Sequence, residues 1–373
     1  MKNIGVKSIG IVAPFIREGD DIVKIVVDSV LDSTAKEEYG QMAFGNVGTE
    51  AGYYLNYHNQ DVIGITESIV ARSSGLYVTV DDIAEWVIKR FGPAAELIID
   101  SPIYSRNRFS MILKGIARAA KKIFFVMPSL DEVGNPSGVN PFTGVDIQKY
   151  YKEICDSENC LSVFGESLYD ATKSINNYGW IYCGLHDYKE WKEKHSGKIA
   201  TLADICSNKN PDFGLLGCNK ATEERLKLFP TIKLADEICY AIRDEIKKKT
   251  GKDVNVLVYG DGCFHSPALD GVRGSSIWEF ADPVTVPGCT HGILDGSPSE
   301  SKLKAIIDES TSDEEVARRL NENKNKNLVG NMNSMGTTPR KYKDLLASLM
   351  DLTSGSGDRA TPIVLVQNYF KEN

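Results

Sequence analysis

The sequence lacks any long apolar run: no segment approaches the roughly 18 consecutive apolar residues that a membrane-spanning helix needs. Its opening residues, MKNIGVKSIGIVAPF, contain Lys7 and several glycines, which interrupt the apolar core of a secretory signal. An excess of positive charge is also absent, since 43 Lys and Arg face 51 Asp and Glu and give a net charge of -8 and a pI of about 5.4. Such an acidic chain is a poor candidate for a protein that neutralises the phosphates of duplex DNA. We therefore expect no membrane partner, no nucleic-acid partner and a cytoplasmic location.

Motifs built on paired cysteine or histidine are missing as well. The eight cysteines form no CxxC pair, so neither a zinc ribbon nor a thioredoxin motif is indicated. We interpret them as reduced, half-buried small apolar residues of an intracellular protein. The chain also lacks an HExxH pair, a Ser/His/Asp order and the GxGxxG fingerprint of dinucleotide-binding folds.

Strand-like and helical patterns alternate along the 373 residues, a length that suits two or three domains. Short apolar, strand-like runs occur at 6–12, 61–66, 97–99, 123–126, 254–259 and 362–366. Helical periodicity occurs at 81–91, 234–250 and 342–352. We predict an α+β fold of mixed sheets and helices, with a body formed by residues 1–140 and 233–373. Residues 141–232, rich in Tyr, Trp, Cys and Lys, are predicted to be a mostly helical insert.

The first segment with candidate ligand-binding residues follows the strand-like run at 61–66 and contains Ser68, Arg72 and Gly75. Hydroxyls, a guanidinium and backbone N–H groups bind phosphate through charge-assisted hydrogen bonds. The same residues are typical of an ordinary helix start, so the segment alone leaves both interpretations open.

Two glycine-containing segments follow other apolar stretches. In Gly260-Asp261-Gly262 the carboxylate can hold Mg²⁺ together with substrate phosphates, although Asp-Gly is also a common turn pair. His265, close by, is a candidate base or an ordinary loop residue. The second segment, SGSGDR at 354–359, is either a phosphate cradle without the Walker ending or a flexible linker.

A basic segment at 104–122 stands out in this acidic chain. Its positive residues are Arg106, Arg108, Lys114, Arg118, Lys121 and Lys122. Such a segment either binds carboxylates and phosphates or forms a solvated face.

Taken in order, these segments resemble the family of coenzyme F-420-0:L-glutamate ligases. The resemblance lies in PFIREGDD at 14–21, DVIGITESIVARSSG at 61–75, VNVLVYGDGCF at 254–264 and LLASLMDLTSGSGDRATPIVLV at 345–366. This family joins glutamate to a phosphate-bearing deazaflavin precursor with GTP and a divalent metal. The resemblance implies the family's two-domain architecture and an intertwined homodimer.

The resemblance also implies roles for individual residues. Ser68 and Arg72 would contact the phosphates of GTP or ATP, with Arg72 in place of the family's Lys. Asp261 would be the surviving ligand for Mg²⁺ or Mn²⁺, and Arg72 and Asp261 would be catalytic. The nucleotide would be cradled by Gly355, Gly357 and Asp358. The negative groups of the acceptor would be bound by Arg106 and Arg108.

Several family residues are replaced in this chain. Ala117 stands where the family has a metal-binding Asp, and Ala120 stands where an Asn meets the nucleotide. The metal-binding Asp-Thr pair becomes Gly260-Asp261, and Ser or Gly replaces an acidic ligand at 354–357. Losing hard oxygen ligands weakens a metal site unless Asp261, Asp358 or Asp131 substitutes.

Three functions follow from the resemblance and its departures. The first is an NTP-dependent ligase that forms a γ-glutamyl amide bond between glutamate and an anionic, cofactor-like acceptor. The second is a non-catalytic nucleotide- or cofactor-binding protein that keeps the ligase fold. The third is a ligase with a different acceptor, such as a folate.

Overall fold

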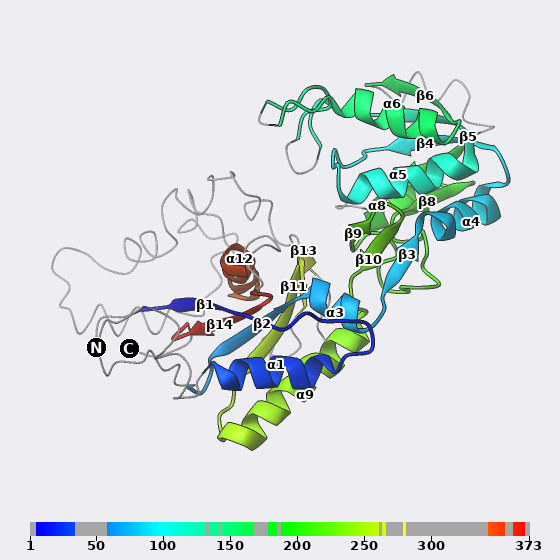
Figure 1. Ribbon diagram of the computed structural model, residues 1–373. Coiled ribbons are helices and arrows are strands. Elements are labelled where there is room, and N and C mark those ends of the chain that lie inside the picture. The colour runs from blue at the N-terminus through cyan, green and yellow to red at the C-terminus, as the bar shows by residue number, and fades with distance from the viewer. Residues whose placement is uncertain are drawn as a thin grey trace. The chain divides into compact units, whose positions relative to one another are not determined.

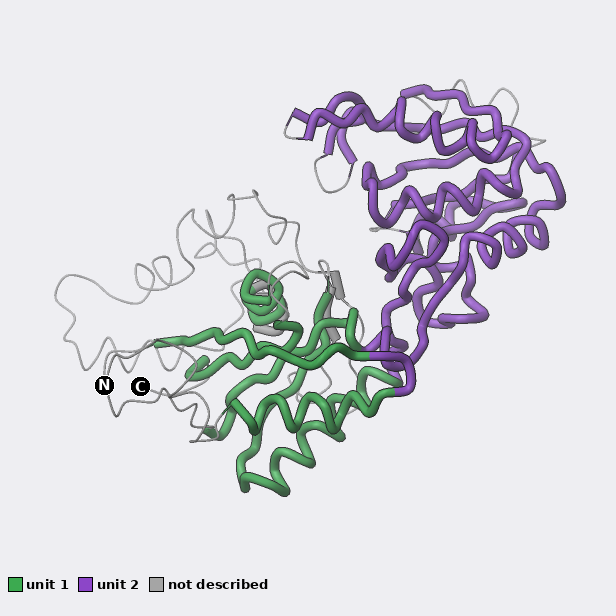
Figure 2. The backbone as a smooth tube through the Cα atoms, viewed as in Figure 1, with its two compact units in different colours: residues 1–16, 20–69, 234–373 green, residues 17–19, 70–233 purple. Residues whose placement is uncertain are grey.

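The computed structural model describes ten stretches of the chain. They are 5–33, 58–131, 135–141, 143–166, 178–184, 188–260, 263–265, 279–280, 342–354 and 361–369. The chain divides into two compact units, coloured separately in Figure 2. Unit 1 comprises Met1–Ile16, Asp20–Ile69 and Leu234–Asn373, and unit 2 comprises Arg17–Gly19 and Val70–Lys233. Helices combine with parallel and antiparallel strands, which confirms the α+β fold.

Unit 1 is built on sheet A, with the strand order β1-β14-β2-β11-β12-β13. Its strands are β1 (Lys7–Ile11), β2 (Val62–Thr66), β11 (Asn255–Gly260), β12 (Cys263–His265), β13 (Glu279–Phe280) and β14 (Ile363–Gln367). β2 and β11 run parallel, whereas β14 runs antiparallel to both β1 and β2. The three strands β14, β2 and β11 are nearly continuous apolar runs, as expected for strands buried on both faces.

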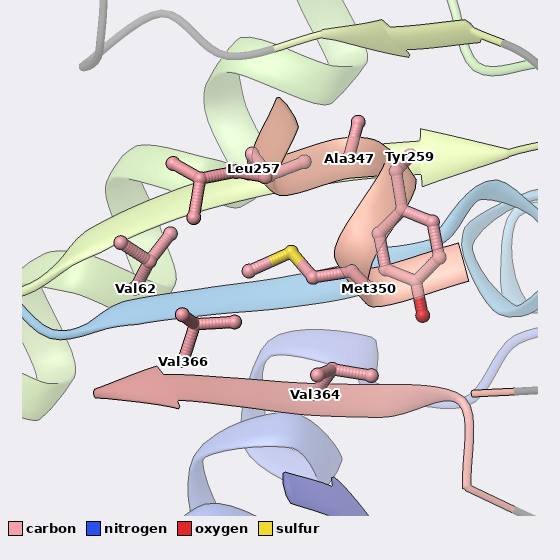
Figure 3. Close-up of a cluster of buried hydrophobic side chains, with 8 residues drawn as sticks. Val62, Leu257, Tyr259, Ala347, Met350, Val364 and Val366 are labelled. Atoms are coloured by element: carbon pink, nitrogen blue, oxygen red, sulfur yellow. The ribbon is translucent and has the colours of Figure 1, made fainter. Parts of the chain in front are cut away.

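Helices cover both faces of sheet A (Figure 1). α12 (Tyr342–Ser354) lies on one face, and α1 (Ile22–Asp32) and α9 (Ile232–Thr250) lie on the other. The α12 face holds a buried cluster formed by Val62, Leu257, Tyr259, Leu346, Ala347, Met350, Val364 and Val366 (Figure 3). α12 approaches β2 so closely that a Cβ on Gly64 would collide with Met350, which explains the glycine in this central strand.

The ends of the helices in unit 1 follow the sequence signals. The Asp21 side chain accepts a hydrogen bond from Lys24 N at 3.0 Å and caps α1. α9 ends before Gly251, whose φ of 71° places it in the left-handed region that favours glycine. The helical periodicity at 234–250 thus ends at a residue suited to a helix C-terminus.

Unit 2 contains sheet C, a parallel sheet with the order β6-β5-β4-β7-β8. Its strands are β4 (Ala95–Asp100), β5 (Ala120–Val126), β6 (Leu161–Gly165), β7 (Gly179–Tyr182) and β8 (Ile199–Thr201). α5 (Arg108–Ala119) connects β4 to β5, and α6 (Ile147–Ser157) lies between β5 and β6 in the chain. The strand order proceeds one way from β4 to β6 and the other way from β4 to β8. β4 and β7 therefore flank a topological switch point.

A smaller antiparallel sheet, sheet B, completes unit 2. It contains β3 (Tyr77–Thr79), β10 (Arg225–Leu228) and β9 (Cys218–Thr222). The remaining helices are α3 (Glu67–Ser73), α4 (Val80–Phe91) and α8 (Tyr188–Lys194). α4 begins one residue earlier than predicted, because Thr79 and Asp82 form a capping box. No helix in the described stretches combines the length and apolarity of a membrane span.

The described part of 141–232 differs in content from the mostly helical insert that the sequence suggested. Besides α6, α8 and the first residue of α9 it contains five strands, β6 to β10, and three of them complete the sheet of β4 and β5. These strands are three to five residues long, and such short runs show no clear period. Residues 141–232 form the later part of unit 2, and residues 70–140 form the part before them.

Candidate functional site

The carboxyl edge of sheet A brings together three chain segments that carry candidate residues. β2 and β11 are parallel, so both end at this edge, and the antiparallel β14 begins there. Thr66 N donates to Pro362 O at 3.0 Å and joins the end of β2 to the start of β14. Thr361 Oγ1 donates to Ser354 O at 3.1 Å, which brings the end of α12 to the same edge. The segments that follow β2, β11 and α12 thus start from one place.

A buried carboxylate lies at this edge. Glu67 directly follows β2, and its side chain is only 3% exposed. It packs over Gly260 at the end of β11 so closely that a Cβ on Gly260 would collide with Glu67 Cγ. Buried carboxylates are rare, and titratable groups in such surroundings concentrate at functional sites. Glu67 therefore joins the candidate residues.

The phenol of Tyr259 lies in the same neighbourhood. Burial raises the pKa of Tyr259, the nearby Ser354 hydroxyl lowers it, and the carboxylates of Asp351 and Glu67 raise it further. A phenol with a raised pKa stays protonated at neutral pH and is a hydrogen-bond donor. The edge therefore combines carboxylates, a hydroxyl and a phenolic O–H group.

The contact between Gly260 and Glu67 predicts the result of a single substitution. Gly260→Ala should lower the free energy of unfolding by about 1–3 kcal/mol, because the added methyl group must displace the buried Glu67 side chain. Urea titration followed by circular dichroism measures the change. Gly5→Ala is the matched control, since a Cβ there meets nothing within 4 Å. Equal effects of the two substitutions would contradict the close packing at Gly260.

The predicted phosphate residues Ser68 and Arg72 lie on one short helix, α3. Ser68 N lies 3.4 Å from Thr66 Oγ1, so Ser68 remains beside the end of β2. Arg72 lies in the last turn, four residues further on, and positions i and i+4 share a helix face. The segment is helical, which is compatible with both interpretations that the sequence left open. Binding of phosphate by Ser68 and Arg72 stays a prediction.

Unit 2 has a second candidate position at the carboxyl edge of sheet C. Ligands of open parallel sheets bind outside the carboxyl ends of the strands at a switch point. Asp100 is the last residue of β4 at this point and is 7% exposed. Burial raises the pKa of Asp100, while a hydrogen bond from Ser101 Oγ at 3.0 Å and the charge of His195 lower it. Ser101 has a φ of 52°, a strained conformation that is enriched at functional sites.

The loop between β4 and α5 at this edge leads directly to Arg106 and Arg108. Arg106 is exposed and Arg108 is half-buried. The loop is held by Tyr151, whose hydroxyl accepts from Ser105 N at 3.1 Å and donates to Ile103 O at 2.6 Å. These anchors give the two arginines a defined position at the start of α5.

Ion pairing separates the positive residues of the basic segment into two groups. Arg118 contacts the carboxylates of Glu158 at 2.9 Å and Asp81 at 2.8 Å, and Lys114 pairs with Glu224. Within the described stretches, neither Arg106 nor Arg108 forms such a pair. Arginines at a helix N-terminus also oppose the helix dipole, an arrangement that an anionic ligand would relieve. Lys114 and Arg118 are therefore structural, whereas Arg106 and Arg108 remain candidates for binding an anion.

Asp131, which the sequence offered as a substitute metal ligand, has a structural role in unit 2. Its carboxylate accepts hydrogen bonds from Tyr104 N at 2.8 Å and Asn135 N at 2.7 Å. Asn135 Nδ2 adds a third bond at 3.1 Å. Asp131 thereby ties the loop after β5 to the loop after β4.

A divalent metal needs several oxygen, nitrogen or sulfur ligands that converge on one point. No group of three or more His, Cys, Asp or Glu side chains is arranged to hold a metal in those stretches. Ala117 is fully buried in α5 and Ala120 is 7% exposed at the start of β5, so neither position offers a ligand. Four predicted site residues lie outside the described residues: Asp261, Gly355, Gly357 and Asp358. The described side chains do not form a metal site, and we assign no reaction step to a metal.

Comparison with known protein families assigns the chain to one of them. The model of the F420-0:gamma-glutamyl ligase family matches residues 10–368, nearly the whole chain. The chain belongs to this family. The resemblance to this family that the four sequence segments indicated is thus confirmed. The matched range also includes residues 141–232. A search of the curated proteins gave no match.

Two candidate residues of this family member were absent from the sequence prediction, Glu67 and Asp100. Each lies at the carboxyl end of a short apolar strand, β2 and β4 respectively. A carboxylate in that position is the signal that identifies them, because strand ends of parallel pairs carry ligand groups.

Proposed function

We propose that this family member is an NTP-dependent ligase that forms a γ-glutamyl amide bond on an anionic, cofactor-like acceptor. The observation that supports it is that the ends of β2, β11 and α12 lie at one edge of sheet A. Family membership over residues 10–368 supports the same reaction class.

The proposed reaction has two steps. The acceptor carboxylate attacks the γ-phosphorus of GTP or ATP, which gives an acyl phosphate and a nucleoside diphosphate. The amine of glutamate then attacks the acyl carbon, inorganic phosphate leaves, and the nitrogen loses one proton. Positioning and charge stabilisation are the main contributions a protein makes to phosphoryl transfer.

In this proposal Ser68 and Arg72 bind the nucleotide phosphates through their hydroxyl and guanidinium groups. Gly355, Gly357 and Asp358 cradle the nucleotide, a role that rests on the family resemblance. Asp261 is proposed as a ligand for Mg²⁺ or Mn²⁺ on the same basis. The homodimer likewise rests on the resemblance.

Arg106 and Arg108 are proposed to bind the negative groups of the acceptor. Arg106→Ala and Arg108→Ala should each raise the acceptor KM by roughly 10- to 100-fold, since a hydrogen bond to a charged group contributes about 1.5–3 kcal/mol. The KM for nucleotide should stay unchanged. Lys121→Ala removes an exposed charge of the same basic segment and is the matched control. A rise in the acceptor KM of the same size for Lys121→Ala would mean that the acceptor responds to the overall positive charge of the segment and not to Arg106 and Arg108 in particular.

The test of the proposed function is a direct assay. Purified protein is incubated with coenzyme F-420-0, L-glutamate, Mg²⁺ or Mn²⁺, and GTP or ATP. Mass spectrometry should show acceptor enlarged by one glutamyl residue, with one phosphate released per bond. Folate in place of F-420-0 tests the other acceptor class. Absence of product with either acceptor, under all nucleotide and metal combinations, would overturn the ligase proposal.

The second candidate function is a binding protein that keeps the ligase fold without catalysis. The replacement of the family's metal-binding Asp by Ala117 favours it, because alanine supplies no metal ligand. Isothermal titration with GTP and ATP distinguishes the two: binding without turnover in the assay above supports this candidate. If neither GTP nor ATP binds, a nucleotide-binding protein without catalysis is excluded too.

A further inference from the structure

The C-terminal end of α6 contains two cysteines in one backbone motif. Cys160 N donates to Cys155 O at 2.9 Å, and Asn159 N donates to Asp156 O at 3.1 Å. Asn159 between them has a φ of 56°. These two bonds and the left-handed residue define a Schellman motif, in which the third-last helical residue packs against the second residue after the cap. In α6 both of these positions are cysteines.

The Schellman motif holds the two thiols together. A side-chain contact between the paired positions commonly accompanies this motif and is usually hydrophobic. Cys155 is fully buried and Cys160 is 2% exposed, and both are free thiols. The hydrogen bond between them lowers the pKa of Cys160 and raises that of Cys155.

Both cysteines have fixed backbones. Cys155 belongs to α6, and Cys160 directly precedes β6, whose first residue Leu161 pairs with Lys122 of β5. A disulfide spans Cα atoms about 4.4–6.8 Å apart, and a backbone hydrogen bond between the same two residues keeps them close. The main-chain hydrogen bond thus keeps Cys155 and Cys160 close enough for a disulfide.

We infer that Cys155 and Cys160 form a dithiol modification site, which a low-molecular-weight disulfide such as oxidised glutathione converts to an intramolecular disulfide. The Cys160 thiolate attacks one sulfur of the reagent, forms a mixed disulfide and releases one thiol. Cys155 then attacks the sulfur of Cys160, forms the protein disulfide and releases the second thiol. Two protein thiols are oxidised, one reagent disulfide is reduced, and the two protons go to the released thiols.

Access to the pair is through the cap of α6. Asp156, Ser157 and Asn159 between the cysteines are exposed, although both thiols are covered. Helix termini open locally at low free energy, so transient opening of the last turn of α6 admits the reagent to Cys160. Reclosure of the Schellman motif then brings Cys155 against the mixed disulfide. The cross-link then fastens the end of α6 to the start of β6.

The test measures the thiol–disulfide equilibrium of the full-length chain in glutathione buffers of defined composition. After acid quenching and alkylation of free thiols, mass spectrometry of the peptides reports the Cys155–Cys160 linkage. The equilibrium constant should be at least about tenfold higher in native protein than in urea, because the motif holds the pair in place. A constant in native protein equal to or below that in urea would overturn the inference.

Variants establish which thiols react. Cys155→Ser and Cys160→Ser should each abolish the linkage, and Cys183→Ser, another buried free cysteine of unit 2, should leave it unchanged. Oxidised wild-type protein should also have a higher Tm than reduced protein, a readout that does not depend on folding of the variants. Preferential linkage of other cysteines, or a lower Tm after oxidation, would contradict the proposed site.

Discussion

Leu257→Ala should lower the free energy of unfolding by about 2–5 kcal/mol, the usual cost of truncating a fully buried leucine. Leu257 is 0% exposed and lies in β11 within the cluster between α12 and sheet A (Figure 3). Its loss leaves a cavity beneath α12, whose C-terminal end lies at the candidate edge. Urea titration measures the stability, and the proposed ligase activity should fall in parallel because the same sheet positions Glu67 and Gly260.

Leu352→Ala is the matched control for this prediction. The same atoms are removed from α12, but Leu352 is 56% exposed, so the change should stay within about 0.5 kcal/mol. A similar loss for both leucines would contradict burial as the cause of the effect at Leu257.

The strands and helices were largely predictable because their local signals agree with their tertiary positions. The apolar runs that became β2, β11 and β14 are buried on both faces, and length with flanking polar residues identified them. Gly251 and Asp21 have the sequence signals of a helix stop and a helix cap. The strands β7 and β8 escaped detection because three or four residues contain too little pattern, and β6 because none of its residues is buried.

The segments that carry candidate site residues could be predicted from the sequence, but the contacts between them could not. Each segment was recognised from residues after an apolar run, yet their meeting depends on β14 lying beside β2 across some 300 residues of sequence. The division of the basic segment into paired and unpaired residues depends on Glu158 and Glu224, which are far from Arg118 in sequence. No local pattern reveals such partners, because long-range pairing is a property of the fold.

Asp131→Ala should lower the free energy of unfolding by about 3–5 kcal/mol, the second large effect that we expect. The substitution removes the acceptor of three hydrogen bonds, from Tyr104 N, Asn135 N and Asn135 Nδ2. A buried donor left without an acceptor, here Tyr104 N, costs about 1–3 kcal/mol, and the two part-buried donors of Asn135 add smaller costs. Asp131→Asn should cost less, because the amide keeps one acceptor oxygen. Some cost remains, because its NH₂ group faces donors that had bonded to the second carboxylate oxygen.

Asp131 also links stability to the proposed acceptor site, because it fixes the loop that precedes Arg106 and Arg108. In Asp131→Asn, which should retain more of the fold, the acceptor KM should rise while the KM for nucleotide stays constant. Asp156→Ala is the control: it removes an exposed carboxylate paired only with Lys152 in the described residues, and both quantities should remain near wild type. An unchanged acceptor KM in a folded Asp131→Asn protein would mean that the loop anchored by Asp131 takes no part in acceptor binding.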